Sequence, residues 1–526
     1  MIREIDPVDA KAQLHAGQEI AFLDVHEAGE FGQGHPLFAV PCPYSRLELQ
    51  VGGLVPNLRV PVVLIDDGGG VAAAAARRLQ ALGYTSVRIV AGGAPAWEAA
   101  GFTLFKGVNV PSKALGELAE VVWHPATIDA ATLSTWRSER RRILLFDARP
   151  PAEYAKMHVP GARCLPNGEL AHRFGAAVPD AGTPIVINCA GRTRGLIGAI
   201  GLRLAGIPNP VMALENGTQG WALAGEDLVR GAAAAPYPSL GAAEIAASRE
   251  RARRLLQAWR IPCVDRSGLD ALRREKDRTL YLFDVRSAEE HRAGHIVGAV
   301  HAPGGQLVQA TDQWIGVRHA RVVLSDDTGL RGALAAFWLR QMGWRVYVHP
   351  GNEANEVSIE HPTARDHEHL PLVSAREAAA GLAAGTHLLL DLRPSQAYRT
   401  GHPRGARWSI RPRLAEAIDE AKRVIVLADE PAVASLAAKD IAELGQPEVA
   451  LLDGGMNGWR QAGLPVDVSP DQPSTDEAID FLTFVHDRHD GNLEASRLYL
   501  AWEMGLVVQL DTDERAEFGL ERPAGR

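Results

Sequence analysis

The chain has 526 residues, 46% hydrophobic and 23% charged, a composition typical of soluble globular proteins, and this length predicts several domains. The net charge is −9 and the basic residues are dispersed, so the basic stripe that nucleic-acid binding requires is missing. No uncharged apolar run is long enough to span a bilayer, and the first residues lack the apolar core of a secretion signal. The four cysteines, Cys42, Cys164, Cys189 and Cys263, have no CxxC spacing, which argues against a disulfide framework or a zinc cage. We therefore expect a cytoplasmic protein that binds neither a membrane nor nucleic acid.

One order of signals occurs four times along the chain. Each segment has a short apolar strand ending in Asp, a Gly-His or Met-His step, a second apolar strand, a small-residue helix and a third strand. The interval from each Asp to the next equals the interval between the corresponding histidines in every case. These landmark pairs are, in chain order, Asp24 and His35, Asp147 and His158, Asp284 and His295, and Asp391 and His402. The chain is therefore predicted to be a tandem array of four repeats.

The alternation of strands and helices in each repeat predicts an α/β fold, with a parallel sheet flanked by helices. The predicted domains are repeat one (residues 1–108), repeat two (122–232), repeat three (255–360) and repeat four (370–470), followed by a helical C-terminal extension (471–526). In such sheets the ligand crevice lies at the carboxyl ends of the strands. The loop after the second apolar strand of each repeat is therefore the place to look for chemistry.

In repeat two, the strand at residues 185–188 leads into Cys189, and a helix is expected to begin a few residues later. Unpaired N–H groups and the helix dipole would form an anion cradle there. We expect the charges of Arg192 and Arg194 to act with this cradle in lowering the pKa of the thiol. Cys189 is therefore the candidate catalytic residue. The candidate substrate-binding residues are Ala190, Gly191, Arg192, Thr193, Arg194 and Gly195.

The other three repeats lack a cysteine at this position. Asp66 stands there in repeat one, Asp326 in repeat three and Ala428 in a shorter segment of repeat four. A carboxylate lacks the nucleophilic sulfur of a cysteine and repels an anion, so these repeats are predicted to be catalytically silent. Arg331, which follows Asp326, is interpreted as a surface or capping arginine. The three remaining cysteines are interpreted as buried, inert side chains.

Repeat two resembles the rhodanese family of sulfurtransferases, and the resemblance extends over residues 1 to about 470. Its matching residues are Asp147, Arg149, Glu153, Tyr154, His158, Pro160, Gly161, Ala162, Cys189, Arg194 and Trp221. The family's Gly-Gly-x-x-x-Trp motif also stands at Gly92, Gly93 and Trp97, and at Gly454, Gly455 and Trp459, with a blurred form at Pro350-Gly351-Asn352. A four-repeat chain with a C-terminal extension is similar to multidomain bacterial thiosulfate sulfurtransferase-like proteins.

The resemblance implies that Cys189 carries sulfane sulfur as a persulfide, with no cofactor and no metal. The thiolate would take sulfur from thiosulfate or another sulfane-sulfur donor and pass it to cyanide or a thiol acceptor, such as glutathione, thioredoxin or a carrier protein. The loop departs from the family's Cys-x-x-Gly because Gly191 comes one place early. The C-x4-R spacing of Cys189 and Arg194 argues against a phosphatase. The alternative from another class is a non-catalytic scaffold or persulfide carrier.

All four repeats keep the Asp and His landmarks although three lack the cysteine, so these landmarks are expected to serve the fold. Asp147 and Arg149 are predicted to form an ion pair, and His158 to bond to backbone. The silent repeats are expected to complete the crevice at domain interfaces or to support a homodimer.

The extension is predicted to form two amphipathic helices around a turn at Asp490-Gly491-Asn492, docked on the rest of the chain or on a second copy. Tyr499 and Trp502 are placed where they could cover the mouth of a neighbouring site. His486, Asp487, His489 and Asp490 are interpreted as a polar helix end and not as metal ligands.

Overall fold

The computed structural model describes residues 2–351, 370–418, 423–445, 448–483 and 492–520. Each of the four repeats contains the predicted parallel α/β sheet. The Asp landmark is the last residue of a strand in every repeat, in β2 (Ile20–Asp24), β7 (Leu144–Asp147), β11 (Leu280–Asp284) and β17 (His387–Asp391). The strand that follows the crossover lies beside it, as β4 (Val62–Ile65), β9 (Ile185–Asn188), β14 (Arg321–Asp326) and β20 (Arg423–Leu427).

The sheets share one strand order. In repeat two the order is β6-β10-β9-β7-β8, and repeats one and four follow it as β1-β5-β4-β2 with β3, and β16-β21-β20-β17-β19. Repeat three has β12-β11-β14-β15. The remaining strands are β1 (Arg3–Ile5), β3 (Val40–Pro41), β5 (Val87–Val90), β6 (Thr127–Ile128), β8 (Arg163–Cys164), β10 (Val211–Leu214), β12 (Val300–His301), β13 (Val317–Arg318), β15 (Arg345–Pro350), β16 (Leu372–Val373), β18 (His402–Pro403), β19 (Arg407–Trp408), β21 (Val449–Leu452) and β22 (Val466–Asp467).

Helices cover the sheets and connect the repeats. Repeats one and two contain α1 (Pro7–Leu14), α2 (Ala28–Gln33), α3 (Leu47–Leu54), α4 (Val71–Ala81), α5 (Gly93–Ala99), α7 (Ala130–Ser138), α8 (Pro151–Lys156), α9 (Asn167–Leu170), α10 (Phe174–Ala177), α11 (Thr193–Leu204) and α12 (Gly217–Leu223). Repeats three and four contain α14 (Arg266–Arg274), α15 (Ala288–Ala293), α16 (Gly304–Gln309), α17 (Leu330–Gln341), α18 (Ala375–Ala383), α19 (Ser395–Thr400), α20 (Leu414–Ala417), α21 (Pro431–Glu443) and α22 (Gly455–Gln461). Two connecting helices, α6 (Val110–Trp123) and α13 (Ala242–Ala258), pack on α11 and α17.

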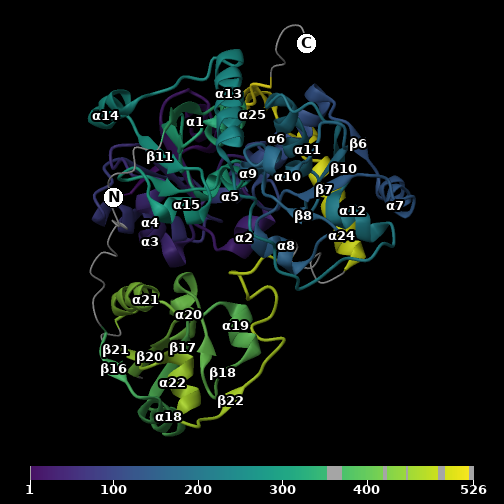
Figure 1. The fold of residues 1–526 in the computed structure, drawn as a ribbon. Helices are drawn as coiled ribbons and strands as arrows, with labels where there is room; N and C mark the ends of the chain where they lie inside the picture. Colours follow the sequence, from purple (N-terminus) through teal and green to yellow (C-terminus); the bar gives the residue numbers. More distant parts are fainter. Residues whose placement is uncertain (1, 352–369, 419–422, 446–447, 484–491, 521–526) are drawn as a thin grey trace.

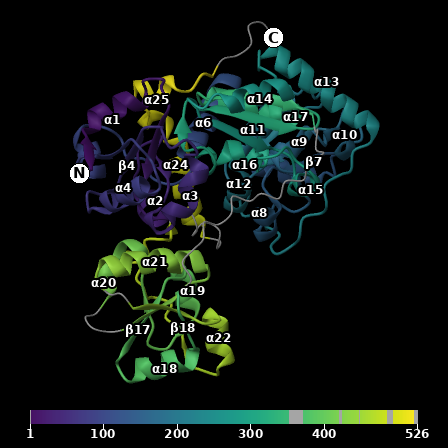
Figure 2. The ribbon, with the colours of Figure 1, turned by 90° about the vertical axis from the view of Figure 1, so that its left-hand side faces the viewer.

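Repeats one to three form one body. A single cluster of buried apolar side chains runs through all three, and β13 of repeat three adds to the sheet of repeat one by pairing antiparallel with β2. Repeat four has its own apolar clusters and lies below this body in Figures 1 and 2. Arg411 of repeat four joins it to repeat one, because its guanidinium binds both Glu48 and Asp440 at 2.6–3.2 Å.

The C-terminal extension leaves repeat four and returns to the three-repeat body (Figure 1). Its helices there are α24 (Leu493–Met504) and α25 (Thr512–Ala516), and Lys11 of repeat one binds Glu514 of α25 at 2.9 Å. Residues 478–482 form turns and irregular backbone, so the first helix predicted for the extension does not include them. The backbone there bonds to other repeats, since the Ile479 carbonyl accepts from the Gly29 N–H. Asn352, His486, Asp487, His489, Asp490 and Gly491 lie outside the described residues.

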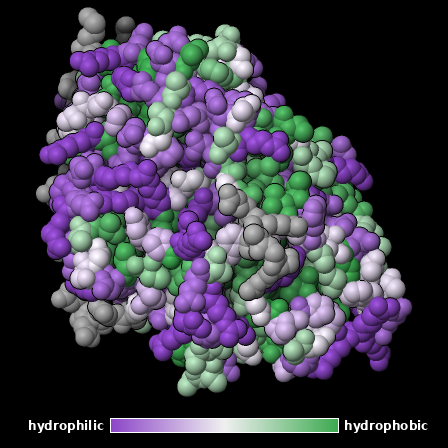
Figure 3. Space-filling model, turned by 90° about the horizontal axis from the view of Figure 1, so that it is seen from above, coloured by the Kyte–Doolittle hydropathy of each residue, from purple (hydrophilic) through white to green (hydrophobic). Residues whose placement is uncertain are grey.

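The face seen from above in Figure 3 intersperses hydrophilic and hydrophobic residues. Among the residues that the structure describes, no helix combines the length and the apolar character needed to traverse a lipid bilayer.

Candidate active site

Cys189 lies where the sequence places it, directly after the buried strand β9 and before the first turn of α11. Strands β7 and β10 flank β9 on both sides, so the position of the cysteine backbone is fixed by the centre of the sheet. The Gly195 N–H, in the first turn of α11, favours the thiolate form of the sulfur. The thiol therefore faces the start of a helix, where unpaired N–H groups favour negative charge.

Helix α12 holds the backbone of the cysteine loop from the other side. The Thr218 N–H donates to the Cys189 carbonyl at 2.8 Å, and the Gln219 N–H donates to the Ala190 carbonyl at 3.1 Å. Gly217 adopts φ +56°, and a Cβ on it would lie 2.3 Å from the Cys189 carbonyl oxygen. Only glycine permits this approach, which explains the glycine ahead of Trp221 in repeat two.

Both arginines of the loop are already paired with carboxylates. The Arg192 guanidinium binds Glu117 of α6 through two hydrogen bonds at 2.8 and 3.0 Å, and it also binds Glu120. The Arg194 guanidinium binds Glu153 of α8 through two hydrogen bonds at 2.7 and 2.8 Å. Their charges are therefore largely compensated, which the loop sequence alone does not reveal.

The predicted lowering of the Cys189 pKa is wrong. Burial raises the pKa of the thiol, and the Glu503 carboxylate adds to this rise, whereas Arg194 and the Gly195 N–H only partly oppose it. Only 2% of Cys189 is exposed, so losing hydration costs the thiolate more than the nearby cation returns. The resting group at neutral pH is thus the thiol.

The Asp and His landmarks of repeat two make the contacts predicted for them. The Arg149 guanidinium binds both oxygens of Asp147 at 2.7–2.8 Å, and it also donates to the Met157 carbonyl. The His158 ring bonds to the Tyr154 carbonyl at 3.0 Å and stacks on the tyrosine ring. The other three histidines bond to the carbonyl four residues earlier in the same way.

A cavity of about 240 Å³ opens beside Cys189 and is lined by five separate parts of the chain, one of which runs from Arg149 to Lys156. Besides the loop, the lining includes Lys113 of α6 and three glutamines of repeat three, Gln306, Gln309 and Gln313. The extension contributes Tyr499, Trp502 and Glu503 from α24. Repeat three therefore completes the cavity, as expected, and the two aromatic residues border it.

Sequence reasoning missed Lys113 and Glu503, because neither belongs to a motif. The Glu503 carboxylate accepts a hydrogen bond from the Thr193 hydroxyl at 2.7 Å and lies 3.4 Å from the Lys113 ammonium. A Cβ on Gly191 would lie 2.9 Å from Glu503 Oε2. The displaced glycine of the loop is therefore the signal that points to Glu503, since it makes room for this carboxylate.

The loops of repeats one and three that carry an aspartate at the cysteine position each hold that carboxylate with N–H groups of the same loop. Asp66 accepts hydrogen bonds from the N–H groups of Gly68, Gly70 and Ala72 at 3.0–3.1 Å. In repeat three, Asp326 accepts from the Arg331 N–H at 2.8 Å. The side chain at the cysteine position thus occupies the cradle in which an anion would otherwise bind.

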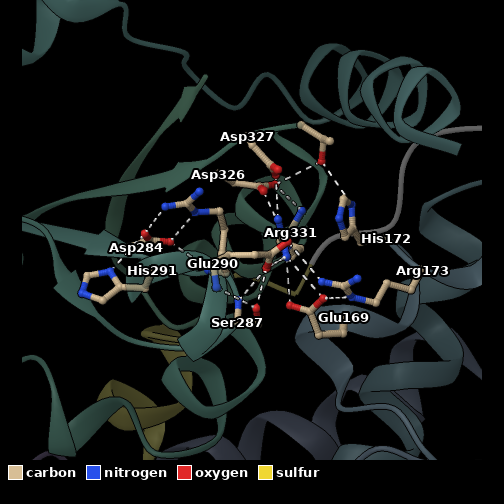
Figure 4. Close-up of polar contacts among 12 residues, drawn as sticks. Glu169, His172, Arg173, Asp284, Ser287, Glu290, His291, Asp326, Asp327 and Arg331 are labelled. Carbon is tan, nitrogen blue, oxygen red and sulfur yellow. Dashed lines mark hydrogen bonds and ion pairs between the residues drawn. The ribbon is translucent and has the colours of Figure 1, made fainter. Parts of the chain in front are cut away.

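The interpretation of Arg331 as a surface residue is wrong, because it is 1% exposed. Its guanidinium contacts Asp326 and Asp327 of repeat three at 3.0 and 2.6 Å. It also contacts Glu290 of repeat three at 2.7 Å and Glu169 of repeat two at 3.0 Å, which places it between the two repeats (Figure 4). Carboxylates from several elements compensate the buried charge of Arg331. Because some of these carboxylates lie far from it in the sequence, the sequence around Arg331 does not indicate that it is buried.

The remaining cysteines differ in exposure. Cys42 is fully buried and burial raises its pKa, as expected for an inert thiol. Burial also raises the pKa of the half-buried Cys164, to about 12. Cys263 is exposed, contrary to its interpretation as buried, and forms a single parallel bridge with Val348 at the edge of the repeat-three sheet.

The comparisons with a family model and with solved structures gave matches over most of this chain. The rhodanese-like domain profile matches residues 6–100, 130–224, 268–352 and 374–462. A crystal structure of thiosulfate sulfurtransferase from Pseudomonas aeruginosa is 38% identical, with 99% of each chain covered and a TM-score of 0.89. A rhodanese-like domain from Anabaena sp. is 22% identical over 20% of this chain and 84% of that one, with a TM-score of 0.18. The comparison with curated proteins gave no significant match.

Proposed function

The chain belongs to the rhodanese family, and on that premise we propose that it is a sulfurtransferase whose single working site is Cys189. The observation that carries the proposal is the contrast among the four loops. Only the loop of repeat two presents a sulfur, and that sulfur borders a cavity, whereas Asp66 and Asp326 occupy the corresponding cradles with their own carboxylates. The name of the 38% identical relative supports thiosulfate as donor.

In the first step the Cys189 thiolate attacks the outer sulfur of thiosulfate. A bond forms between the two sulfurs, the sulfur–sulfur bond of thiosulfate breaks, and sulfite leaves with the electron pair. Residues Ala190 to Gly195 would hold the donor through backbone N–H groups at the start of α11, because Arg192 and Arg194 already bind carboxylates. The raised pKa keeps the thiolate fraction small, but a more basic thiolate is also a stronger nucleophile.

In the second step the outer sulfur passes to cyanide or to a thiol. The cavity has room beside the persulfide for a small acceptor, since one water takes up about 30 Å³ in the liquid. The wall that repeat three and α24 supply would limit entry of bulk water and orient the acceptor.

The test is the intact mass of the purified protein before and after thiosulfate, for the wild type and for Cys189→Ser. We expect the wild type to gain the mass of one sulfur atom and to lose it again on addition of cyanide. Cys189→Ser should gain nothing. Cys263→Ser, which removes the exposed cysteine away from the site, is the matched control and should behave like the wild type. A wild type that gains no sulfur would refute the proposal and favour a scaffold.

A further inference from the structure

The cavity beside Cys189 contains a pair of opposite charges that the cysteine loop does not supply. The Lys113 ammonium and the Glu503 carboxylate both line it, at 7% and 1% exposure of their residues. The Lys113 ammonium lies 5.0 Å from the ring centre of Tyr499 and 5.6 Å from that of Trp502. Two buried charges are thus kept at the reacting sulfur, where apolar side chains would be less costly.

Both residues come from outside the matched rhodanese-like segments. Lys113 is on α6, between the matched segments 6–100 and 130–224, and Glu503 is on α24, beyond the last one at 374–462. The loop itself accommodates Glu503, because a Cβ on Gly191 would collide with the carboxylate. The pair is therefore an addition to the rhodanese module that acts at its active site.

The separation of the pair distinguishes it from the other ion pairs around the cavity. Arg194 and Glu153 bond at 2.7 and 2.8 Å, a closed geometry that uses both carboxylate oxygens. Lys113 and Glu503 stand 3.4 Å apart, and the same carboxylate oxygen also accepts from the Thr193 hydroxyl. A ligand that carries its own ammonium and carboxylate matches this pair of charges.

We propose that Lys113 and Glu503 recognise the head group of an α-amino-acid thiol, which is the sulfur acceptor. This inference rests on the proposed sulfurtransferase function. The acceptor's ammonium binds Glu503 and its carboxylate binds Lys113, so that its thiol is directed toward the persulfide on Cys189. Free cysteine is the smallest acceptor of this class and is of a size that the cavity admits.

The transfer is balanced without an added oxidant or reductant. The acceptor thiol loses its proton to solvent, and its thiolate attacks the outer sulfur of the Cys189 perthiol. A sulfur–sulfur bond forms to the acceptor, the bond to Cys189 Sγ breaks, and the electron pair returns to Sγ as thiolate. The products are the acceptor persulfide and the free Cys189 thiolate.

The experiment loads the full-length protein with thiosulfate and measures discharge of the persulfide by four thiols. These are cysteine, cysteamine, 3-mercaptopropionate and 2-mercaptoethanol, which carry both charges, only the ammonium, only the carboxylate, or neither. The variants are Glu503→Gln and Lys113→Met, with Glu494→Gln on the exposed face of α24 and Lys439→Met on repeat four as matched controls. Intrinsic thiol reactivity cancels when each ratio is compared between variant and wild type.

We expect Glu503→Gln to reduce the ratio of cysteine to 3-mercaptopropionate by about tenfold, because these two differ in the ammonium. Lys113→Met should reduce the ratio of cysteine to cysteamine by a similar factor, and the controls should change neither ratio. Variants that slow all four thiols alike, or leave both ratios unchanged, would overturn the recognition role. If the wild type takes up no sulfur from thiosulfate, the proposed function itself fails, which the mass measurement shows before any acceptor is added.

Discussion

Replacing Arg331 with methionine tests whether the buried charge network holds repeats two and three together. Methionine retains much of the apolar stem but leaves Asp326 and Asp327 without this cation. Glu169 and Glu290 also lose it and keep their contacts with Arg173. Removing one partner of a buried ion pair costs about 3–5 kcal/mol, since the other charges stay desolvated. We expect a loss of about 4 kcal/mol in the free energy of unfolding, measured as the shift of the urea midpoint with its slope.

The matched control is Arg253→Met on the exposed surface of α13, where the guanidinium pairs with Glu250. Exposed pairs contribute about 0–1 kcal/mol, so this variant should stay close to the wild type. If Arg331→Met loses no more stability than Arg253→Met, the network does not stabilise the interface and the reasoning is refuted.

The stability that this charge network provides should depend on pH. Burial raises the pKa of Glu290, but Arg331 and Ser287 outweigh it and hold the pKa at about 2, below the ordinary 4.5. A depressed pKa stabilises the folded protein above the ordinary value, and this stability is lost as the pH falls from 4.5 toward 2. Without Arg331, the part of the unfolding free energy that depends on pH in this window should shrink.

Three further changes test other parts of the structure. Asp440→Asn removes the negative charge that binds Arg78 and Arg411 at 2.6 Å, and we expect repeat four to separate from repeat one. Small-angle scattering would detect this as an increased radius of gyration, and an unchanged radius would contradict the prediction. Gly217→Ala places a Cβ against the Cys189 carbonyl and should slow the uptake of sulfur from thiosulfate at least about tenfold. The control Gly225→Ala, which has open space around it, should not slow this uptake. Equal uptake rates for the two variants would show that the cysteine loop tolerates the strain. Alkylation of Cys189 by iodoacetamide, followed by peptide mass spectrometry, should keep accelerating above pH 9, because its pKa is raised; a plateau below that pH would be inconsistent with the burial argument.

The sequence was sufficient to predict the features that depend on residues close together in the chain. The Asp landmarks end their strands, Cys189 follows β9, and His158 bonds within its own segment, because each of these depends on residues a few positions away. The repeat itself revealed the fold, since four copies of one strand and helix order are hard to satisfy with another architecture.

The parts that sequence reasoning missed depend on contacts between distant segments. From the sequence, Arg192 was predicted to bind substrate, but in the structure its guanidinium pairs with Glu117 of α6. In the sequence, Glu503 is one of several charged residues on an amphipathic helix, yet in the structure it lies against the cysteine loop of repeat two. No spacing rule connects such residues, because their proximity arises from how the repeats pack on one another.

The position of α24 in the chain has a consequence for biosynthesis. The ribosome produces the Cys189 loop first, then two further repeats, and only then the helix that contributes Tyr499, Trp502 and Glu503 to the cavity. A nascent or prematurely terminated polypeptide thus carries Cys189 without the outer wall of the cavity. Assembly of the cavity coincides with the end of translation, so a chain interrupted after repeat four would keep the proposed nucleophile but would lack the surface that we propose to select an acceptor.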